Sequence, residues 1–368
     1  MAYPVRIAAI DVRALEVPLL HPFAIATARM IATRSVEVKV TVSSMDGTLA
    51  NGLGEGAALP PVTSEDLPDV LVSIRRAAAA LVGRHVDVLS EAFARDLDAL
   101  FPDAPVARSA VEVALLDASA RILGLTLRAW LGGERGRATR ALTTDITLPI
   151  AAPDDMAFRA RTWSERGFGI FKVKVGLNLD QDIKSLVAVK DAVPGARFRI
   201  DANAGFSSGD AVRMARALEE REFEIECYEQ PCAADDLDAM ARVTEAVDPP
   251  VIADESVKTL SDLHRVIAHR AADGVNLKIV KSGGLLAART LGEEARRRGM
   301  PVMVGGMVET RLGMTAGAHL AATLGGVAFV DLDTAWLLAE DPYEGGYRAK
   351  GPMYDLGDEP GLGVRPIR

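Results

Sequence analysis

The hydrophobic positions follow two different periods along the chain. Residues 5–58 alternate between apolar and polar side chains, as in Val36-Glu-Val-Lys-Val40, which is the two-residue period of a half-buried strand. Residues 64–133 instead carry apolar side chains at helical spacing, most regularly between Ala107 and Leu123. A run of strands followed by a run of helices predicts a small α+β domain.

From residue 142 the pattern changes to short apolar runs separated by amphipathic segments such as Ser207–Glu220 and Leu285–Arg298. Such units, repeated about every 25 residues, predict a (β/α) barrel, because parallel strands need helical crossovers. The tail after Ala339 contains no further unit, so we expect it to return to the N-terminal domain. The predicted barrel strands are residues 143–148, 170–175, 198–201, 225–229, 251–253, 274–279, 302–304 and 328–332.

Composition narrows the class of protein. The chain has 368 residues, of which 49% are hydrophobic, enough for a large core in one barrel with an accessory domain. Its formal net charge of −9 argues against nucleic acid, whose phosphates it would repel. We find neither a secretory signal nor a run of about 20 uncharged residues that could cross a bilayer. We therefore expect a cytoplasmic enzyme without nucleic-acid or membrane partners.

Three successive predicted strands end in a carboxylate: Asp201, Glu229 and Asp254. The carboxyl ends of barrel strands meet at one rim, where the active sites of such barrels lie. Carboxylate oxygens suit a hard cation, most plausibly Mg²⁺, and three of them would hold it without help from substrate phosphates. We predict one Mg²⁺ per subunit at this rim.

Lysines lie on the strands to either side of these carboxylates. Lys172 and Lys174 are two residues apart on a strand, so both side chains point to the same face. Two close ammonium groups near a dication should lower the lysine pKa, which suits a general base. Lys278 would face Lys174 across the substrate, and a bound cation can stabilise the enolate left when an α-proton departs. The set predicts proton transfer at the α-carbon of a carboxylate.

Single members of this set have simpler interpretations. Asp254-Glu-Ser256 could cap a helix, and Asn203-Ala-Gly205 could form a turn. The segment Gly52-Leu-Gly54-Glu-Gly56 looks like a phosphate-binding fingerprint, but no βαβ pattern follows it. We interpret it as a turn.

The ordered set of strand-end motifs resembles the muconate-lactonizing subgroup of the enolase superfamily over essentially the whole chain. The resemblance implies an α/β fold, with an α+β capping domain over a modified (β/α)7β TIM-like barrel. We place the capping domain at residues 1–135, the barrel at residues 136–338 and the returning segment at residues 339–368. The motifs are Lys172-Val-Lys174, Asp201-Ala-Asn203, Glu229-Gln-Pro231, Asp254-Glu-Ser256 and Lys278-Ile-Val-Lys-Ser-Gly-Gly284.

The resemblance also implies roles for these residues. Lys174 and Lys278 would be the acid/base groups, and Lys172 would support the base and the enolate oxygen. Three residues would be the Mg²⁺ ligands: Asp201, Glu229 and Asp254.

Within the subgroup, three further segments are similar to dipeptide epimerases: Thr144-Asp-Ile-Thr147, Met307-Val-Glu-Thr-Arg-Leu-Gly313 and Asp331-Leu-Asp333. In that family the paired aspartates hold the α-ammonium of the substrate, while Mg²⁺ takes the terminal carboxylate. The resemblance implies that Thr147, Gly306 and Met307 line the pocket. A capped turn after strand eight is the simpler interpretation of Asp331-Leu-Asp333.

One segment departs from the family pattern. Members selective for acidic side chains place an arginine in the loop after the first strand. Here the segment reads His21-Pro-Phe-Ala-Ile-Ala-Thr-Ala-Arg29, with Arg29 offset by one residue. We therefore do not assume an alanyl-glutamate substrate.

The leading hypothesis is a dipeptide epimerase that inverts the C-terminal residue by two-base 1,1-proton transfer, acting as a homo-oligomer. The alternatives are an N-acylamino-acid racemase, a proline-derivative epimerase or dehydratase, and a muconate-type cycloisomerase. An N-acyl substrate has no ammonium group and would leave Asp331 and Asp333 without a role. A non-catalytic scaffold would not need both facing lysines and all three metal ligands.

Overall fold

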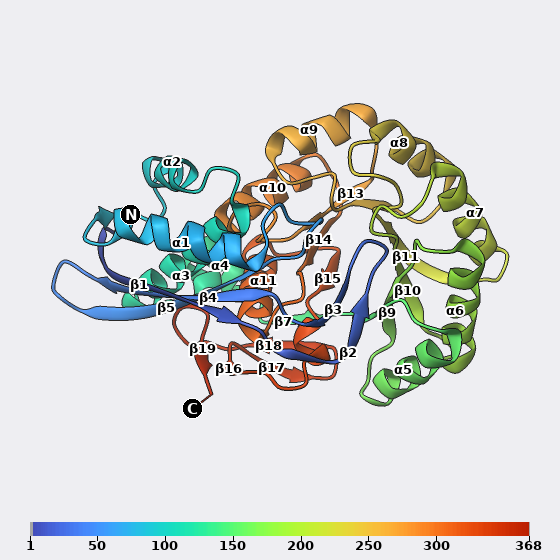
Figure 1. Cartoon of the computed structure of the whole chain (residues 1–368), viewed down its shortest axis with the longest axis horizontal. Coiled ribbons are helices and arrows are strands. Elements are labelled where there is room, and N and C mark those ends of the chain that lie inside the picture. The colour runs from blue at the N-terminus through green and yellow to red at the C-terminus, as the bar shows by residue number, and fades with distance from the viewer. Residues whose placement is uncertain (1–2, 368) are drawn as a thin grey trace.

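The computed structural model describes residues 3–367 and begins with an antiparallel sheet of strand order β5-β4-β1-β6. Figure 1 shows this sheet and its helices at the left and the barrel at the right. The alternation read from the sequence is confirmed, because Val36, Val38, Val40 and Val42 are all fully buried. The strands and helices of this part are β1 (Val5–Leu15), β4 (Ser35–Ser43), β5 (Leu49–Ala57), β6 (His85–Val86), α1 (Leu67–Leu81), α2 (Glu91–Leu100), α3 (Pro105–Ile122) and α4 (Leu127–Ala138).

The glycine-rich segment at residues 52–56 lies inside strand β5, so its interpretation as a turn is wrong. Its glycines face helix α3 at very short range. A Cβ at Gly52 would lie 2.1 Å from the carbonyl oxygen of Ala114, and one at Gly54 would lie 2.1 Å from that of Ala110. The glycines are there because strand and helix pack backbone to backbone.

A hairpin of β2 (Pro18–Ala24) and β3 (Arg29–Ala32) connects this sheet to the barrel. The backbone carbonyl of Ala24 accepts a hydrogen bond from the amide of Ile150, which follows the first barrel strand. Figure 1 shows the hairpin in blue beside the barrel. Residues 21–29 are therefore placed against the strand ends.

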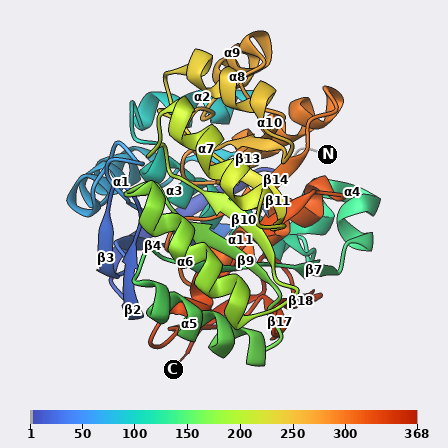
Figure 2. The same ribbon diagram turned by 90° about the vertical axis from the view of Figure 1, so that its right-hand side faces the viewer.

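The barrel is an eight-stranded parallel sheet in the order β8 to β15, with a helix between each pair of consecutive strands (Figure 2). The last strand is followed by a short 3-10 helix, η1 (Thr334–Leu337), so the predicted (β/α)7β fold is confirmed. The strands are β8 (Ile146–Leu148), β9 (Ile170–Lys174), β10 (Arg197–Asp201), β11 (Glu224–Glu229), β12 (Val251–Ala253), β13 (Gly274–Leu277), β14 (Val302–Gly305) and β15 (Phe329–Asp331).

The helices of the barrel alternate with its strands, and most are amphipathic, as their spacing predicted, whereas α11 (Arg311–Leu324) is buried from Leu312 to Leu324. Within residues 3–367, none of the helices is both long and apolar enough to cross a membrane. The barrel helices are α5 (Pro153–Glu165), α6 (Leu179–Ala192), α7 (Ser208–Glu219), α8 (Leu237–Ala246), α9 (Leu260–His269), α10 (Leu285–Arg297) and α11 (Arg311–Leu324).

The first predicted barrel strand is split in two. Residues 141–143 form β7 (Ala141–Thr143), which pairs with the C-terminal segment, and only β8 joins the barrel. Thr144 and Asp145 lie between them at the seam where β8 meets β15. There the amide of Asp145 donates to the carbonyl of Val330 at 3.3 Å, and the Thr144 hydroxyl accepts from the amide of Leu332 at 2.8 Å.

The C-terminal segment forms short strands that touch both halves of the molecule. The Tyr343 hydroxyl donates to Glu37 of β4, and the amide of Leu362 donates to Asp117 of α3 at 2.7 Å. Strand β18 pairs with β7 at the start of the barrel. The strands are β16 (Tyr343–Gly345), β17 (Tyr347–Lys350), β18 (Met353–Leu356) and β19 (Val364–Pro366).

Candidate active site

Lys172 lies at the centre of the strand-end cluster. It is fully buried, and its ammonium nitrogen contacts three carboxylates: Asp331 at 2.5 Å, Glu229 at 2.8 Å and Asp201 at 3.2 Å. These side chains come from β9, β15, β11 and β10, whose registers bring Lys174 opposite Asp201 and Asp201 opposite Glu229. The parallel ladder therefore gathers residues that are far apart in sequence.

The other two predicted lysines also reach carboxylates of this rim. The Lys174 ammonium lies 2.5 Å from Asp201, and the Lys278 ammonium lies 2.7 Å from Asp254. Asp254 is held from a second direction by Lys281, whose ammonium contacts one carboxylate oxygen at 2.6 Å and the backbone carbonyl at 2.5 Å. Lys174 and Lys278 line one cavity, as the two-base hypothesis requires.

The carboxylates of the rim act on the pKa values of Lys172 and Lys278. Burial alone would lower the pKa of Lys172, but the carboxylates of Asp331, Glu229 and Asp201 raise it well above its ordinary value. Burial likewise opposes the charge of Lys278, and Asp254 raises its pKa overall. The lowered pKa expected for Lys172 and Lys174 stays a prediction, because it rests on a bound dication whose charge would offset that of these carboxylates.

The donor set at the predicted metal site is made of oxygen atoms. Asp201, Glu229 and Asp254 are all fully buried, and one oxygen of Glu229 contacts the Lys172 ammonium at 2.8 Å. Its other oxygen accepts from the Asn276 amide at 2.8 Å. Three carboxylates buried at the ends of adjacent strands need positive charge close by, because an unpaired buried charge is costly. The residues fit a hard divalent cation, whose charge would compete with the lysines for these carboxylates.

A second acidic cluster lies at the barrel seam. Oxygens of Asp145, Asp331 and Asp333 lie within 4.8 Å of one another. Asp145 pairs with the Arg199 guanidinium at 2.8 Å, and Asp333 accepts from the backbone amide of Thr147 at 2.5 Å. Burial, and then the neighbouring Asp331, raise the pKa of Asp333 to about 6. In the part of the chain described here, the second oxygen of Asp333 has no partner, so the cluster suits a cationic group.

The predicted pocket residues meet at one small cavity of about 30 Å³, roughly the volume of one water molecule. Apolar side chains from the hairpin and from the loop after β5 line this cavity, namely Phe23, Ile25, Leu59 and Val62. Arg29 is exposed on β3. The predicted residues at the cavity are Thr147, Lys174, Lys278, Gly306, Met307, Asp331 and Asp333.

Other residues of the site were missed by the sequence analysis. The signal for two of them is the two-residue period of a strand, because Arg199 precedes Asp201 and Asn276 precedes Lys278 by two positions. Asp145 stood inside a quoted motif without a role. Asn276 contacts Glu229 and Lys281 contacts Asp254, whereas Asp145 lies beside Asp331 and Asp333 and is itself paired with Arg199.

Glu309 supports the turn that lines the cavity. Its carboxylate accepts from the backbone amide of Met307 at 2.8 Å, and its neighbour Glu55 of β5 accepts from the Thr310 hydroxyl at 2.6 Å and the Gly313 amide at 3.0 Å. Burial, and then the charge of Glu55, raise the pKa of Glu309 to about 8. Two buried carboxyls therefore join the capping sheet to the start of α11.

We expect the Glu309→Gln variant to lose less stability than the wild type as pH rises. A carboxyl whose folded pKa of about 8 exceeds its ordinary value of 4.5 leaves stability intact below pH 4.5. Between pH 4.5 and pH 8 the carboxyl of Glu309 is ionised in the unfolded state but still protonated in the folded state. The free energy of unfolding therefore falls by roughly a few kcal/mol over this range. Denaturant titration of the metal-loaded protein at pH 5, 6.5 and 8 measures this difference.

The matched control is Glu245→Gln, because Glu245 is an exposed carboxyl on α8. This variant should follow the wild-type pH dependence. Parallel curves for Glu309→Gln and the wild type would contradict the raised pKa of Glu309.

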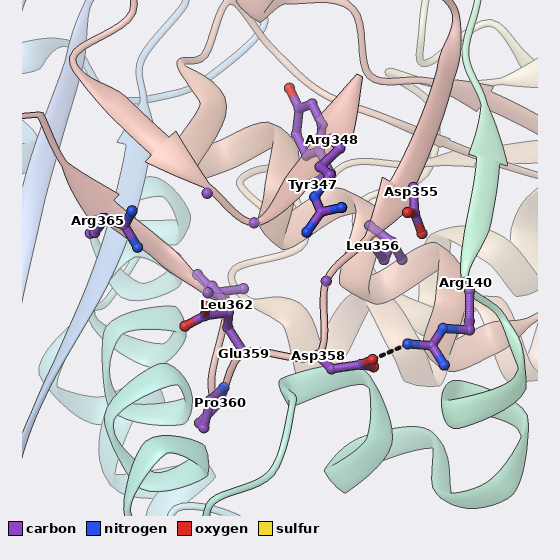
Figure 3. Close-up of a pocket in the computed structure, with 14 residues that line it drawn as sticks. Arg140, Tyr347, Arg348, Asp355, Leu356, Asp358, Glu359, Pro360, Leu362 and Arg365 are labelled. Carbon is purple, nitrogen blue, oxygen red and sulfur yellow. Dashed lines mark hydrogen bonds and ion pairs between the residues drawn. The ribbon is translucent and has the colours of Figure 1, made fainter. Parts of the chain in front are cut away.

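A surface hollow of about 700 Å³ lies away from the strand ends (Figure 3). It is lined by Arg140, which pairs with Asp358, and by residues 345–348, 355–360, 362, 363 and 365 of the C-terminal segment. Its arginines and carboxylates lie beside the backbone of the short terminal strands. It shares no residue with the predicted site.

Two family models match the chain. Residues 9–132 match the mandelate racemase/muconate lactonizing enzyme N-terminal domain, and residues 155–368 match a model described as enolase C-terminal domain-like.

Solved structures match over almost the whole chain. A substrate-liganded complex of the L-Ala-D/L-Glu epimerase from Bacillus subtilis is 33% identical, with a TM-score of 0.91 and coverage of 98% of this chain and 99% of that one. The dipeptide epimerase from Cytophaga hutchinsonii, complexed with Mg and D-Ala-L-Val, is 30% identical, with a TM-score of 0.90 and coverage of 99% and 96%. The N-succinyl Arg/Lys racemase from Bacillus cereus is also 30% identical, with a TM-score of 0.90 and coverage of 98% and 96%.

Proposed function

Because the chain belongs to the mandelate racemase and muconate lactonizing enzyme family of the enolase superfamily, we propose that it is a magnesium-dependent dipeptide epimerase. The observation that carries the proposal is one cavity that is lined by Lys174, Lys278, Asp331 and Asp333. Two proton carriers and a pair of carboxylates for a cationic substrate end are then within reach of one small molecule. The similar proteins that act on dipeptides support this choice.

The proposed reaction inverts the α-carbon of the C-terminal residue. One of Lys174 and Lys278 removes the α-proton from its side, and the other returns a proton to the opposite side of the planar enolate. Lys172, whose ammonium contacts Asp201 and Glu229, would place positive charge beside the enolate oxygen. Both acid/base lysines lie in a buried, water-poor site, where each charge acts more strongly than in water.

Mg²⁺ would be held by Asp201, Glu229 and Asp254. When bound, it supplies positive charge to the carboxylate end of the substrate. Its three ligands also contact the lysines, so the ligands set both the charge and the position of the bases.

The ammonium end of the substrate would bind at Asp331 and Asp333. Asp331 contacts Lys172, whereas Asp333 keeps one oxygen without a partner among the described residues. Since that oxygen is buried, a donor from the substrate would compensate the cost of its burial. An N-acyl amino acid offers no cation here, which weighs against the N-acylamino-acid racemase alternative despite the similar N-succinyl racemase.

We expect a dipeptide to exchange its C-terminal α-proton in D2O at least tenfold faster than its N-acetylated form. A charge-assisted hydrogen bond contributes ~1.5–3 kcal/mol, so Asp333→Asn should lower kcat/KM for the dipeptide roughly tenfold to a hundredfold. Mass spectrometry of deuterium uptake reads both effects. A wild type that prefers the acetylated compound would instead support an N-acylamino-acid racemase and leave the lysine assignment standing.

The wall of the cavity also indicates the polarity of the side chain on the second residue of the substrate. Phe23 and Ile25 of the hairpin face the cavity together with Leu59 and Val62, and none of these side chains offers a charge. Arg29 is exposed on β3 and is not among the residues that line this cavity, so it supplies no charge there. We therefore propose an apolar C-terminal residue and not glutamate.

Three further proposals rest on the sequence. They are the division of the chain at about residues 135 and 338, a cytoplasmic location and a homo-oligomeric state. The net charge of −9 supports the proposal that the protein does not bind nucleic acid.

A further inference from the structure

A second cavity of about 200 Å³ lies beside the first, on the outer side of the barrel seam. It is enclosed by the β2–β3 hairpin, helix α5 and the short helix η1. Its walls are mainly apolar and aromatic, with Leu20, Phe158, Trp163 and Leu337 among the lining residues. An apolar cavity of about 150 Å³ is enough to take a benzene ring, so this one has room for an aromatic side chain.

The two cavities share a wall. Phe23 and Thr147 line both of them. Thr147 also donates its backbone amide to Asp333, at 2.5 Å. The outer cavity, as we call it, therefore begins next to the carboxylates that would hold the substrate ammonium.

The position fixes which part of a dipeptide lies nearest. The ammonium group and the first side chain are attached to the same α-carbon, whereas the C-terminal carboxylate points toward the metal ligands at the other side of the rim. A first residue held by Asp331 and Asp333 has its α-carbon close to Thr147. Because Thr147 and Phe23 line both cavities, the outer cavity is then the neighbouring space for its side chain.

The chemistry of the lining selects the side chain. Among the lining residues that the structure describes, the charged ones are cationic, Arg159 and Arg166, and the guanidinium of Arg166 lies 4.8 Å from the Trp163 ring centroid. Phe158 lines this cavity and is 62% exposed, so its ring is free to contact a bound side chain. Basic side chains would be repelled, while aromatic and large apolar ones would gain contact with Phe158 and Trp163.

We propose that the outer cavity receives the side chain of the first residue of the dipeptide, and that this residue is large and apolar, preferably aromatic. This inference rests on the proposed epimerase function. It names the first-residue specificity of the same site.

The experiment compares L-Phe-L-Leu with L-Ala-L-Leu on the metal-loaded enzyme, by deuterium uptake at the leucine α-carbon. The wild type should have the higher kcat/KM with L-Phe-L-Leu. Thr162→Phe adds a ring to the cavity wall from α5 and should lower the Phe-to-Ala ratio of kcat/KM at least tenfold, a typical discrimination for apolar pockets. Phe158→Ala, which removes an exposed ring, should lower the same ratio without threatening the fold.

The matched control is Arg161→Phe, which adds the same ring one position away on the exposed face of α5. It should leave the ratio unchanged. The inference is overturned if the wild type prefers L-Ala-L-Leu, or if both cavity variants keep the wild-type ratio while still exchanging L-Ala-L-Leu. Absence of exchange with every dipeptide, in a folded and metal-loaded protein, would instead refute the epimerase function and the inference with it.

Discussion

Replacing Lys174 or Lys278 with alanine is expected to abolish epimerisation while the remaining lysine still exchanges the α-proton of one stereoisomer. Both ammonium groups line the cavity, and inversion needs one group to remove the proton and another to return it. General acid–base catalysis contributes about 10²–10⁴-fold, so losing either lysine should lower the epimerisation rate by roughly 10³-fold. Each variant should label a different stereoisomer in D2O.

The measurement is nuclear magnetic resonance or mass spectrometry of each pure stereoisomer, with thermal unfolding to verify the fold. Removing Lys174 leaves Asp201 with one cation fewer, so this check is needed. Lys184→Ala, on the exposed face of α6, is the matched control and should epimerise like the wild type. A single variant that interconverts both stereoisomers at near wild-type rate would refute the two-base assignment.

Chelation of the divalent cation is expected to abolish turnover, and added Mg²⁺ to restore it. Without the cation, the buried carboxylates keep the lysines in ion pairs and the substrate carboxylate meets no positive partner at the rim. Glu229→Gln should weaken binding of the ion itself, because it removes a charged oxygen ligand. Full activity of the chelated protein would exclude the metal from the mechanism.

Binding of Mn²⁺ can be measured without activity, by titration followed with electron paramagnetic resonance. We expect one ion per subunit in the wild type and a loss of affinity of at least tenfold in Glu229→Gln. Glu224→Gln is the matched control, since Glu224 lies exposed at the other end of the same strand. Equal affinity in both variants would show that Glu229 is not a ligand.

The barrel and most of the site could be predicted because strand period and strand end are local properties of the sequence. Asp201 and Glu229 end short predicted strands, and parallel pairing then places them opposite each other. The raised pKa of Lys172 could not be predicted this way, since it depends on which of several carboxylates lies within 3 Å. Distances of that kind are set by side-chain packing in three dimensions.

Two further features could not be predicted from the sequence, because they depend on contacts between residues that are far apart in the chain. The glycines at positions 52, 54 and 56 satisfy a turn and a tightly packed strand equally well, and only helix α3 distinguishes the two. The pair of Glu55 and Glu309 joins residues that are 254 positions apart (309 minus 55). A local pattern carries no information about such a contact.

The glycines of strand β5 also determine how closely helix α3 packs, and through this contact where Glu55 lies. Gly54 and Gly56 face helix α3, so Glu55, between them, projects from the opposite face of β5 toward the start of α11. The packing distance between α3 and β5 therefore determines the position of the Glu55 carboxyl relative to the barrel. A methyl group added at Gly54 would lift the strand, shift Glu55 against Glu309 and disturb the Met307 turn at the substrate cavity. Catalytic geometry here is tied to a contact in the capping sheet that no substrate touches.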